Sequence, residues 1–290
     1  MRNAFFKAHG LGNDYLVVDP EDLDFKLTSA RIRRLCDRHE GVGGDGVLAM
    51  VPARKGDFGL RIFNPDGSEA EKSGNGLRIF ARFLHATGRT RRDHFRVETR
   101  GGVVALSVDL DAHGEVHYVT AAMGRASFRP EDLPCTLEVD ELIEQAIRVG
   151  SRTVRFTGVS VGNPHCVVFR PRGRSWTERE LHTLGPILQT HRIFPRFTNV
   201  QLAVPTSRHA LSLLIWERGA GATRASGSSA TAAAAAGVRL GLVKSPVTVK
   251  MPGGQLRVEV SDDFDVTLAG PVSAVARGHL APEFVRRLAR

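Results

Sequence analysis

EKSGNGLRIFARFL, residues 71–84, and RASGSSATAAAAAG, residues 224–237, show the chain building one local structure twice. In each stretch a serine and a glycine come directly before a run of apolar or small residues. Serine is a preferred N-cap residue, so both stretches predict a helix that begins just after the serine. Ser226 follows Ser73 by 153 positions, about half of the 290 residues, which indicates that the chain repeats itself.

The similarity between the halves extends beyond the two serines. At the same offset LRIFNPDGSEAEKSGNG (60–76) aligns without gaps with LLIWERGAGATRASGSS (213–229), and GVLAMV aligns with NVQLAV. Closer to the N-terminus, GNDYLVVD (12–19) resembles GNPHCVVF (162–169) at an offset of 150. Three similar stretches in the same order predict two halves of one architecture rather than a solenoid.

Strands outnumber helices in the expected secondary structure. Alternating runs predict strands at HFRVET, VVALSVDL, EVHYVTAAM, TVRFTGVSV, PVTVKM and QLRVEVSDD. Helices are expected at SARIRRLCDRH, GNGLRIFARFLHATG, DELIEQAIRVG, TERELHTLGPILQTH and SSATAAAAAGVRLG, with Gly88 and Gly241 as C-terminal caps. We therefore predict an α/β (α+β) fold of two quasi-symmetric domains, each a mostly antiparallel sheet wrapped around a central helix.

The expected domain division follows from the repeat. We place the first domain at residues 1–120 plus 273–290 and the second at residues 121–272, with the crossing in AAMGRASFRPEDLP. No apolar run is long enough for a membrane span, and the first residues lack a signal peptide's hydrophobic region. Three cysteines without metal-like spacing suit a reducing compartment, so we expect a cytoplasmic protein without a membrane partner.

The formal charge of +9 raises the possibility of a nucleic-acid partner. The arginines, however, are scattered in runs that acidic or apolar residues interrupt, and no aromatic-basic interleaving occurs. An anionic substrate explains the charge equally well, so we expect no nucleic acid. We also expect no metal and no cofactor. No His/Cys/Asp cluster has ligand spacing, and GVGGDG leads into a strand rather than opening a helix.

Both helix starts have the chemistry of an anion site. The Ser-Gly openings leave several backbone N–H groups free, and a helix N-terminus carries roughly half a positive elementary charge. A carboxylate is therefore favoured at either tip. The alternative is that Ser73 and Ser226 are N-caps and nothing more.

Six motifs, in order and across nearly the whole chain, resemble the diaminopimelate epimerase family. They are HGLGNDY (9–15), RHEGVGGDGVL (38–48), FNPDGSEAEKSGNGLR (63–78), VGNPHCVVF (161–169), FPRFTNVQ (194–201) and WERGAGATRASGS (216–228). The resemblance implies two quasi-symmetric α/β domains, an active site in the cleft between them, and a homodimer. It also implies a cofactor-independent conversion of LL- to meso-diaminopimelate, a lysine and peptidoglycan precursor, in which one group removes the α-proton and another returns a proton to the opposite face.

The resemblance assigns roles to individual residues. Ser73 and Ser226 occupy the two proton-transfer positions, and His165 and Glu217 occupy positions that tune them. The groups that hold the substrate are the side chains of Asn13, Asn64, Asn163, Asn199 and Arg218 and the backbone of Gly74, Asn75, Gly227 and Ser228. For the asparagines the plain alternative is a turn residue, above all where proline follows.

The chain departs from the family at the two proton-transfer positions, where the family has cysteine. An alcohol is a much weaker acid than a thiol, so ordinary two-thiol epimerisation should be impaired. The serines are engineered, or they belong to a relative with one-base chemistry, or to an amino-acid-binding homologue without catalysis. Ala222, Ser229 and Thr231 depart from the family as well, which favours natural divergence. A Ser73–His165 hydrolase is a further alternative, but no GxSxG elbow supports it.

Overall fold

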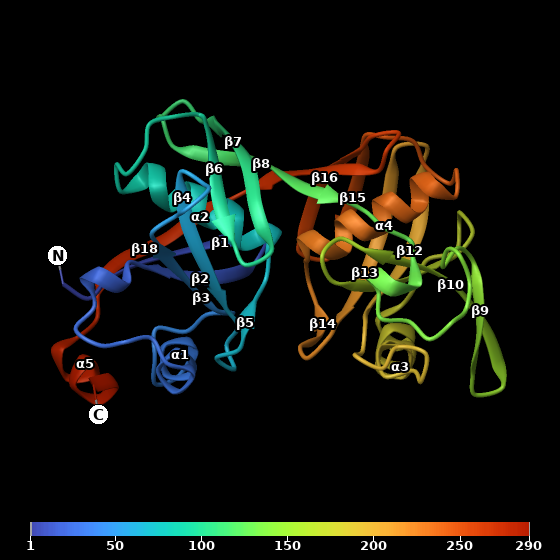
Figure 1. Ribbon diagram of the computed structural model, residues 1–290, viewed down its shortest axis with the longest axis horizontal. Coiled ribbons are helices and arrows are strands. Elements are labelled where there is room, and N and C mark those ends of the chain that lie inside the picture. Colours follow the sequence, from blue (N-terminus) through green and yellow to red (C-terminus); the bar gives the residue numbers. More distant parts are fainter. Residues whose placement is uncertain (1, 290) are drawn as a thin grey trace. The chain divides into compact units, whose positions relative to one another are not determined.

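The two serine-tipped stretches form two buried helices in the computed structural model, which describes residues 2–289 (Figure 1). α2 spans Gly74–Ala86 and α4 spans Gly227–Arg239, so the bounds of the two helices are 153 positions apart. Residues 74–84 of α2 and 229–237 of α4 are all buried. A helix that is buried on every side must be apolar or small all round, and these two sequences are, apart from a few polar side chains that are discussed below.

The chain divides into two units, each with one of these helices. The first unit is Met1–Ala121 with Gly270–Arg290, and the second is Ala122–Ala269. We propose that these units are the two domains expected from the repeat.

In the first unit, strands surround α2. They are β1 (Ala4–Gly10), β2 (Asn13–Val18), β3 (Val47–Val51), β4 (Phe58–Phe63), β5 (Glu69–Ala70), β6 (His94–Thr99), β7 (Gly102–Leu110), most of β8 (Val116–Arg125) and β18 (Ser273–His279). The pairs β1–β18, β1–β2, β3–β4, β4–β5, β6–β7 and β7–β8 are antiparallel, whereas β2–β3 and β4–β6 are parallel. Three shorter helices complete the unit: η1 (Pro20–Asp22), α1 (Ser29–Cys36) and α5 (Pro282–Ala289).

The second unit repeats this plan around α4. Its strands are β9 (Gln145–Val149), β10 (Arg152–Ser160), β11 (Pro164–Phe169), β12 (Asn199–Ser207), β13 (Ala210–Glu217), β14 (Gly221–Thr223), β15 (Val247–Met251), β16 (Gly254–Val260) and most of β17 (Asp265–Pro271). Again β11–β12 and β13–β15 are parallel, and the other pairs are antiparallel. η2 (Pro130–Asp132) and α3 (Glu178–Gln189) lie outside this sheet.

The repeat extends to the register of the strands. Val47 pairs with Phe63 in the first unit, and Val200 pairs with Trp216 in the second. Both members of the second pair are 153 positions beyond those of the first. The pairs Ile62–Ala70 and Ile215–Thr223 show the same offset. The predicted mixed α/β fold with two quasi-symmetric halves is confirmed.

The core of each unit forms on both sides of its sheet. α2 packs on β1, β2 and β18, and α4 packs on β10–β13, β15 and β16. A second apolar layer fills the opposite side of the sheet, with Ile32 and Leu35 of α1 in the first unit and Leu181 and Leu188 of α3 in the second. Fully burying a large apolar side chain stabilises a fold by about 1.5–3 kcal/mol, so these layers position the helices firmly.

One predicted helix is wrong. Within DELIEQAIRVG the residues Gln145–Val149 form strand β9, which pairs antiparallel with β10. Ile147 and Val149 are buried while the residues between and before them are exposed, a period of two that suits a strand. Gly150, at φ 60°, supplies the tight turn into β10. This pattern outweighs the helix propensity of the glutamates.

The other predicted helices and all six predicted strands are confirmed within a few residues. Gly88 and Gly241 have φ values of 68° and 67° and directly follow the C-caps of α2 and α4. Helix α5 was not predicted. It is a short amphipathic helix that buries Val285 and Leu288.

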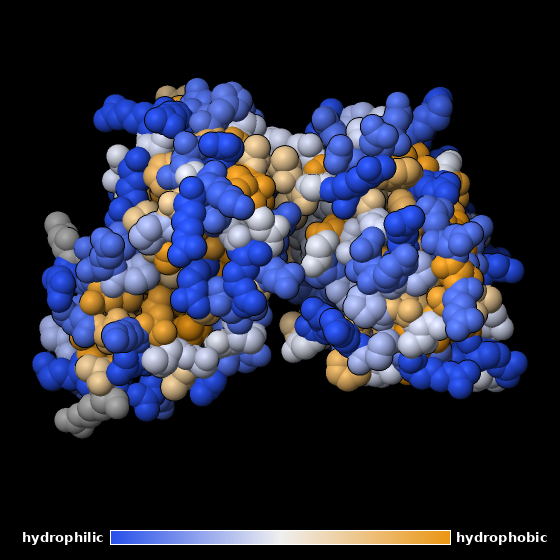
Figure 2. Space-filling model, viewed as in Figure 1, coloured by the Kyte–Doolittle hydropathy of each residue, from blue (hydrophilic) through white to orange (hydrophobic). Residues whose placement is uncertain are grey.

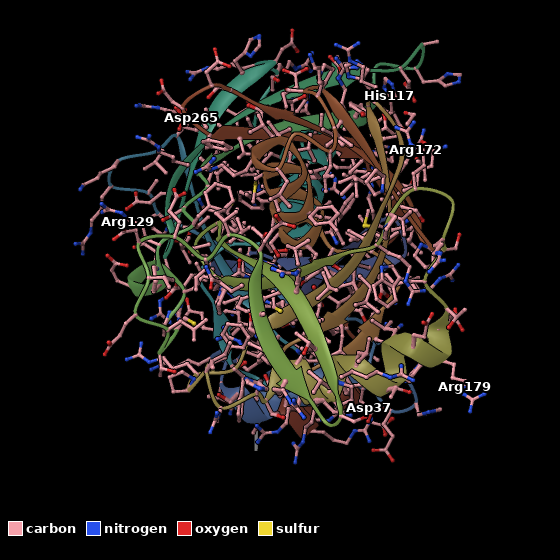
Figure 3. The ribbon with its side chains drawn as sticks, turned by 90° about the vertical axis from the view of Figure 1, so that its right-hand side faces the viewer. Asp37, His117, Arg129, Arg172, Arg179 and Asp265 are labelled. Atoms are coloured by element: carbon pink, nitrogen blue, oxygen red, sulfur yellow. The ribbon has the colours of Figure 1, made fainter. Side chains whose placement is uncertain are left out.

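Charged side chains extend from many separate places on the surface. Arg129, Arg172 and Arg179 point outward from the second unit (Figure 3), and hydrophilic residues cover most of the visible face in Figure 2. Other arginines pair with carboxylates, for example Arg170 with Glu180 at 2.6 Å. Between residues 2 and 289, no helix has the length and apolar character to cross a membrane.

The loop before β3 provides a test of close packing. A Cβ added at Gly46 would lie 2.3 Å from the carbonyl oxygen of Phe63 and 2.5 Å from the ring of Tyr15, whereas one at Gly44 would meet only ordinary contacts of 3.4 Å or more. We expect Gly46→Ala to lower the free energy of unfolding by about 1–3 kcal/mol because the backbone must move. Chemical denaturation measures this loss, with Gly44→Ala as the matched control. Equal stability of the two variants would contradict the packing at Gly46.

Candidate active site

Ser73 caps the N-terminus of α2. Its backbone is extended, with φ −143° and ψ 118°, and its Oγ accepts a hydrogen bond from the N–H of Gly76 at 3.0 Å. The first-turn amides of a helix have no acceptor within the helix, so the N–H groups of Gly74 and Asn75 are suited to an anion.

Ser226 caps α4 in the same way. Its φ of −146° and ψ of 128° match those of Ser73, and its Oγ accepts from the N–H of Ser229 at 3.4 Å. The hydroxyl of Ser228 lies 3.4 Å from that of Ser226. The N-cap geometry predicted from the sequence is therefore present at both tips. An N-cap role does not exclude a role in proton transfer. The amide N–H that donates to the capping atom would also stabilise that atom as an anionic oxygen or sulfur.

A polar network places Asn13 and Asn75 beside the α2 tip. Asn75, which is buried, donates through Nδ2 to Oδ1 of Asn13 at 3.0 Å. Asn13 in turn donates to Oδ2 of Asp45 at 2.9 Å. Arg38 binds Asp45 at 2.8 Å and Asp14 at 2.6 Å. The GVGGDG loop therefore supplies the carboxylate that orients Asn13.

Asp14 stays ionised within this network. Its burial alone would raise the pKa of the carboxyl, but hydrogen bonds from Arg38 and Lys7 outweigh burial and hold the pKa below its ordinary value. Two cations and two carboxylates thus balance one another next to the α2 tip.

Arg78 stabilises the α2 tip from within the helix. Its side chain is fully buried and donates to the carbonyl oxygen of Gly74 at 3.2 Å, to Oδ1 of Asn75 at 2.7 Å and to the carbonyl oxygen of Pro271 at 3.3 Å. Burial lowers the pKa of Arg78 to about 10, which still leaves it charged at neutral pH. Gly10 makes room for it, since a Cβ there would lie 2.7 Å from Nη2. Sequence reasoning missed Arg78, although an arginine in the middle of a mostly apolar helix was a usable signal.

Asn64 lies in the turn between β4 and β5. Its Nδ2 donates to Oγ of Ser68 at 2.9 Å, and its backbone N–H donates to the carbonyl oxygen of Ser68 at 2.8 Å. The turn role that an asparagine before proline predicts is therefore present, and binding of a substrate by Asn64 stays a prediction.

His165 is a neutral, fully buried residue of β11. Its Nδ1 lies 2.9 Å from Nε2 of Gln201, and its Nε2 lies 2.9 Å from Oδ1 of Asn163. Burial lowers the pKa of His165 to about 3, and the nearby charge of Arg218 acts in the same direction. Because both ring nitrogens are engaged, His165 is arranged to orient its neighbours rather than to take a proton from Ser226.

Asn199 fixes the end of β13, where the two charged site residues follow each other. Its Nδ2 donates to the carbonyl oxygen of Pro164 at 2.9 Å, and its Oδ1 accepts from the N–H of Arg218 at 2.9 Å. The guanidinium of Arg218 is exposed and donates to the carbonyl oxygen of Arg196 at 3.2 Å. Glu217 is the last residue of β13, and its backbone carbonyl oxygen accepts a hydrogen bond from the N–H of Ala220 in the turn that follows.

The three cysteines, at positions 36, 135 and 166, do not stand at either helix tip in the sequence. Burial raises the pKa of Cys36 to about 12, and it also raises the pKa values of Cys135 and Cys166 above their ordinary value. These thiols are therefore protonated at neutral pH.

Each unit thus brings part of the predicted site together. In the first unit Ser73, Gly74, Asn75 and Asn13 surround the start of α2. The second unit carries the rest of the set except Asn64, namely Ser226, Gly227, Ser228, Asn163, His165, Asn199, Glu217 and Arg218. Sequence reasoning missed Gln201, which links His165 to α4 by donating to Oγ of Ser229 at 3.0 Å.

The chain matches known proteins over nearly its whole length. The family model "Diaminopimelate epimerase" matches residues 5–129 and 157–275. The chain is 44% identical over 280 residues to Diaminopimelate epimerase 2 of Nostoc sp., and these residues cover 96% of each protein. It is 39% identical over 281 residues to the diaminopimelate epimerase of Moorella thermoacetica, which covers 94% of this chain and 98% of the relative.

Solved structures share the fold at lower identity. A hydroxyproline epimerase from Agrobacterium vitis superposes with a TM-score of 0.71 at 15% identity, covering 97% of this chain and 93% of that one. A phenazine biosynthesis protein of Bacillus anthracis gives a TM-score of 0.66 at 14% identity, covering 96% and 98%. At such identities the match concerns the fold alone. The sequence relatives and the family model show that the chain belongs to the diaminopimelate epimerase family, a family of isomerases.

Proposed function

We propose that this protein binds diaminopimelate and moves protons at its α-carbon without a cofactor. One observation carries the proposal: two helix N-termini, at equivalent positions of a duplicated chain, each have a hydroxyl held by a first-turn amide. Inversion at a carbon needs one proton-transfer group for each face, and Ser73 and Ser226 are two such groups.

The helix tips also suit the carboxylate of an amino acid. When the α-proton leaves, negative charge spreads onto that carboxylate, and backbone N–H donors stabilise the charge without having to reorganise. Gly74, Asn75, Gly227 and Ser228 are the proposed donors. The exposed guanidinium of Arg218 matches the distal carboxylate, since arginine binds carboxylates with two parallel hydrogen bonds.

Asparagines suit the remaining polar groups of the ligand. We propose that Asn13, Asn64, Asn163 and Asn199 bind its amino and carboxylate groups. Asn13 and Asn199 are already oriented by Asp45 and by the carbonyl oxygen of Pro164. The homodimer and the cytoplasmic location expected from the sequence belong to the same proposal.

The two serines limit the rate. An alcohol holds its proton more tightly than a thiol, and each pKa unit corresponds to about 1.36 kcal/mol. His165 is neutral with both nitrogens engaged, which leaves Glu217 as the proposed base for a serine hydroxyl. Binding without rapid turnover is therefore a second candidate function, and the serine N-caps are the observation that favours it.

Proton exchange with solvent separates these two functions. We expect LL-diaminopimelate incubated with the protein in D₂O to lose its α-proton signal slowly in the NMR spectrum and to appear in part as the meso isomer. Ligand-induced shifts without any exchange would instead identify a binding protein. Exchange without inversion would identify one-base chemistry, and an absence of both shifts and exchange would rule out the proposed ligand.

Restoring the thiols tests the two positions directly. We expect the double variant Ser73→Cys with Ser226→Cys to exchange the α-proton about 100-fold faster or more, because a thiolate at a helix N-terminus is accessible at neutral pH. Exchange rates in D₂O measure the gain. The matched control is Ser151→Cys, which adds an exposed thiol in the turn between β9 and β10. If the double variant is no faster than this control, Ser73 and Ser226 are not the proton-transfer positions.

A further inference from the structure

We propose that Gln201 is a positioning residue, which fixes the tautomer of His165 and through it the direction in which the amide of Asn163 points. The consequence for ligand binding rests on the proposed function, in which Asn163 contacts the amino acid. The hydrogen bonds among Gln201, His165 and Asn163 do not depend on that function.

Gln201 meets two acceptors with one amide nitrogen. It lies on β12 and is fully buried, and its Nε2 is 2.9 Å from Nδ1 of His165 and 3.0 Å from Oγ of Ser229. An amide nitrogen has two hydrogens, so both are used. Within the described residues, Oε1 of Gln201 has no hydrogen-bond partner.

The opposite orientation of this amide is less favourable. Turning it over would point Oε1 at His165 and Ser229 and would put two N–H donors in the place of Oε1, which has no hydrogen-bond partner within the described residues. Buried donors without partners are rarer and costlier than a carbonyl oxygen without one. In the orientation that the structure has, Gln201 is a donor to Nδ1 of His165.

The hydrogen bond donated by Gln201 determines the direction of the next hydrogen bond, from His165 to Asn163. Because Nδ1 accepts, the proton of the neutral imidazole is on Nε2, which then donates to Oδ1 of Asn163 at 2.9 Å. The oxygen of that amide is thereby occupied, and its NH₂ group points away from His165. Asn163, which is half-buried, is then left with two donors for an acceptor such as a carboxylate oxygen.

Ser229 provides the second anchor for Gln201. It is a fully buried residue of α4, and its Oγ accepts the other hydrogen of the Gln201 amide. Ser229→Gly removes this anchor but leaves the donor to His165 in place, so it is the matched control.

The tautomer of His165 can be observed without any ligand. In long-range ¹H–¹⁵N spectra of protein labelled at histidine, we expect Nδ1 of His165 to be unprotonated and Nε2 to be protonated. We expect no titration between pH 5 and pH 8, since burial places the pKa at about 3. The His165→Asn variant identifies the signal by its loss. A proton on Nδ1 would overturn the proposal.

Substitution at Gln201 tests the link to Asn163. We expect Gln201→Leu to weaken binding of meso-diaminopimelate about tenfold or more, the size of effect that lost orienting hydrogen bonds have at other sites. The exchange rate at saturating ligand should change far less, so the loss is in affinity and not in general activity. Calorimetry and the D₂O assay measure the two quantities, and Ser229→Gly should keep both the tautomer and most of the affinity.

Gln201→Glu replaces the hydrogen-bond donor at this position with an acceptor. A carboxylate can only accept, so we expect the His165 proton to move to Nδ1 and the affinity to fall as in Gln201→Leu. Unchanged affinity in both Gln201 variants would overturn the role of Gln201. If the native protein binds no diaminopimelate, the proposed function fails, whereas the His165 spectrum still decides the tautomer and with it this inference.

Discussion

Each half of this protein depends on the complete burial of one helix by a sheet. α2 and α4 have apolar or small residues on all faces, and strands surround them in the same order in both units. The two helices reach this state differently. α2 fills its surroundings with leucine, isoleucine and phenylalanine, whereas α4 uses alanine and lets the neighbouring residues approach closely. At Gly237 even one added methyl group would lie 2.9 Å from Val243.

Burial of the helix has a consequence for its N-terminus. A helix packed on every side cannot fray, so its first-turn amides are held in a fixed direction with few partners of their own. Ser73 and Ser226 satisfy one amide each, and we propose that the other first-turn amides form a rigid anion site. The chemistry at the tips thus follows from the packing, since the apolar contacts along each helix supply the rigidity that electrostatic stabilisation requires.

The fold was largely predictable because its signals are local and repeated. The serine-glycine pairs that begin the two helices, the glycines that end them and the offset of 153 residues are visible in the amino-acid sequence. DELIEQAIRVG failed because residues 145–149 carry weak helix propensity and a period-two pattern at once, and pairing with β10 decided between them. α5 escaped notice because Ala281, the residue before it, is not one of the preferred N-cap residues, whereas Thr28 precedes the equally short α1.

The candidate site was predictable only in its motif residues. Gln201 and Asp45 act by holding side chains that are distant in sequence, whereas Arg78 holds Asn75 within the same helix. Gln201 is 36 positions from His165, and Asp45 is 32 positions from Asn13. Composition and spacing do not reveal such pairs. A buried polar residue in a strand or helix is the one available hint, because burial without a hydrogen bond is costly.

The hydroxyls around α4 bear on why serine stands at its tip. Serine and cysteine fill an N-cap position almost equally well, so the fold alone does not require either. Ser229 accepts a hydrogen bond from Gln201 of β12, and Thr231 donates to the carbonyl oxygen of Gly227 at 2.9 Å, so both hydroxyls have buried partners. We propose that Ser226 diverged naturally together with Ser229 and Thr231, because a single change made at the tip would not alter neighbouring positions as well.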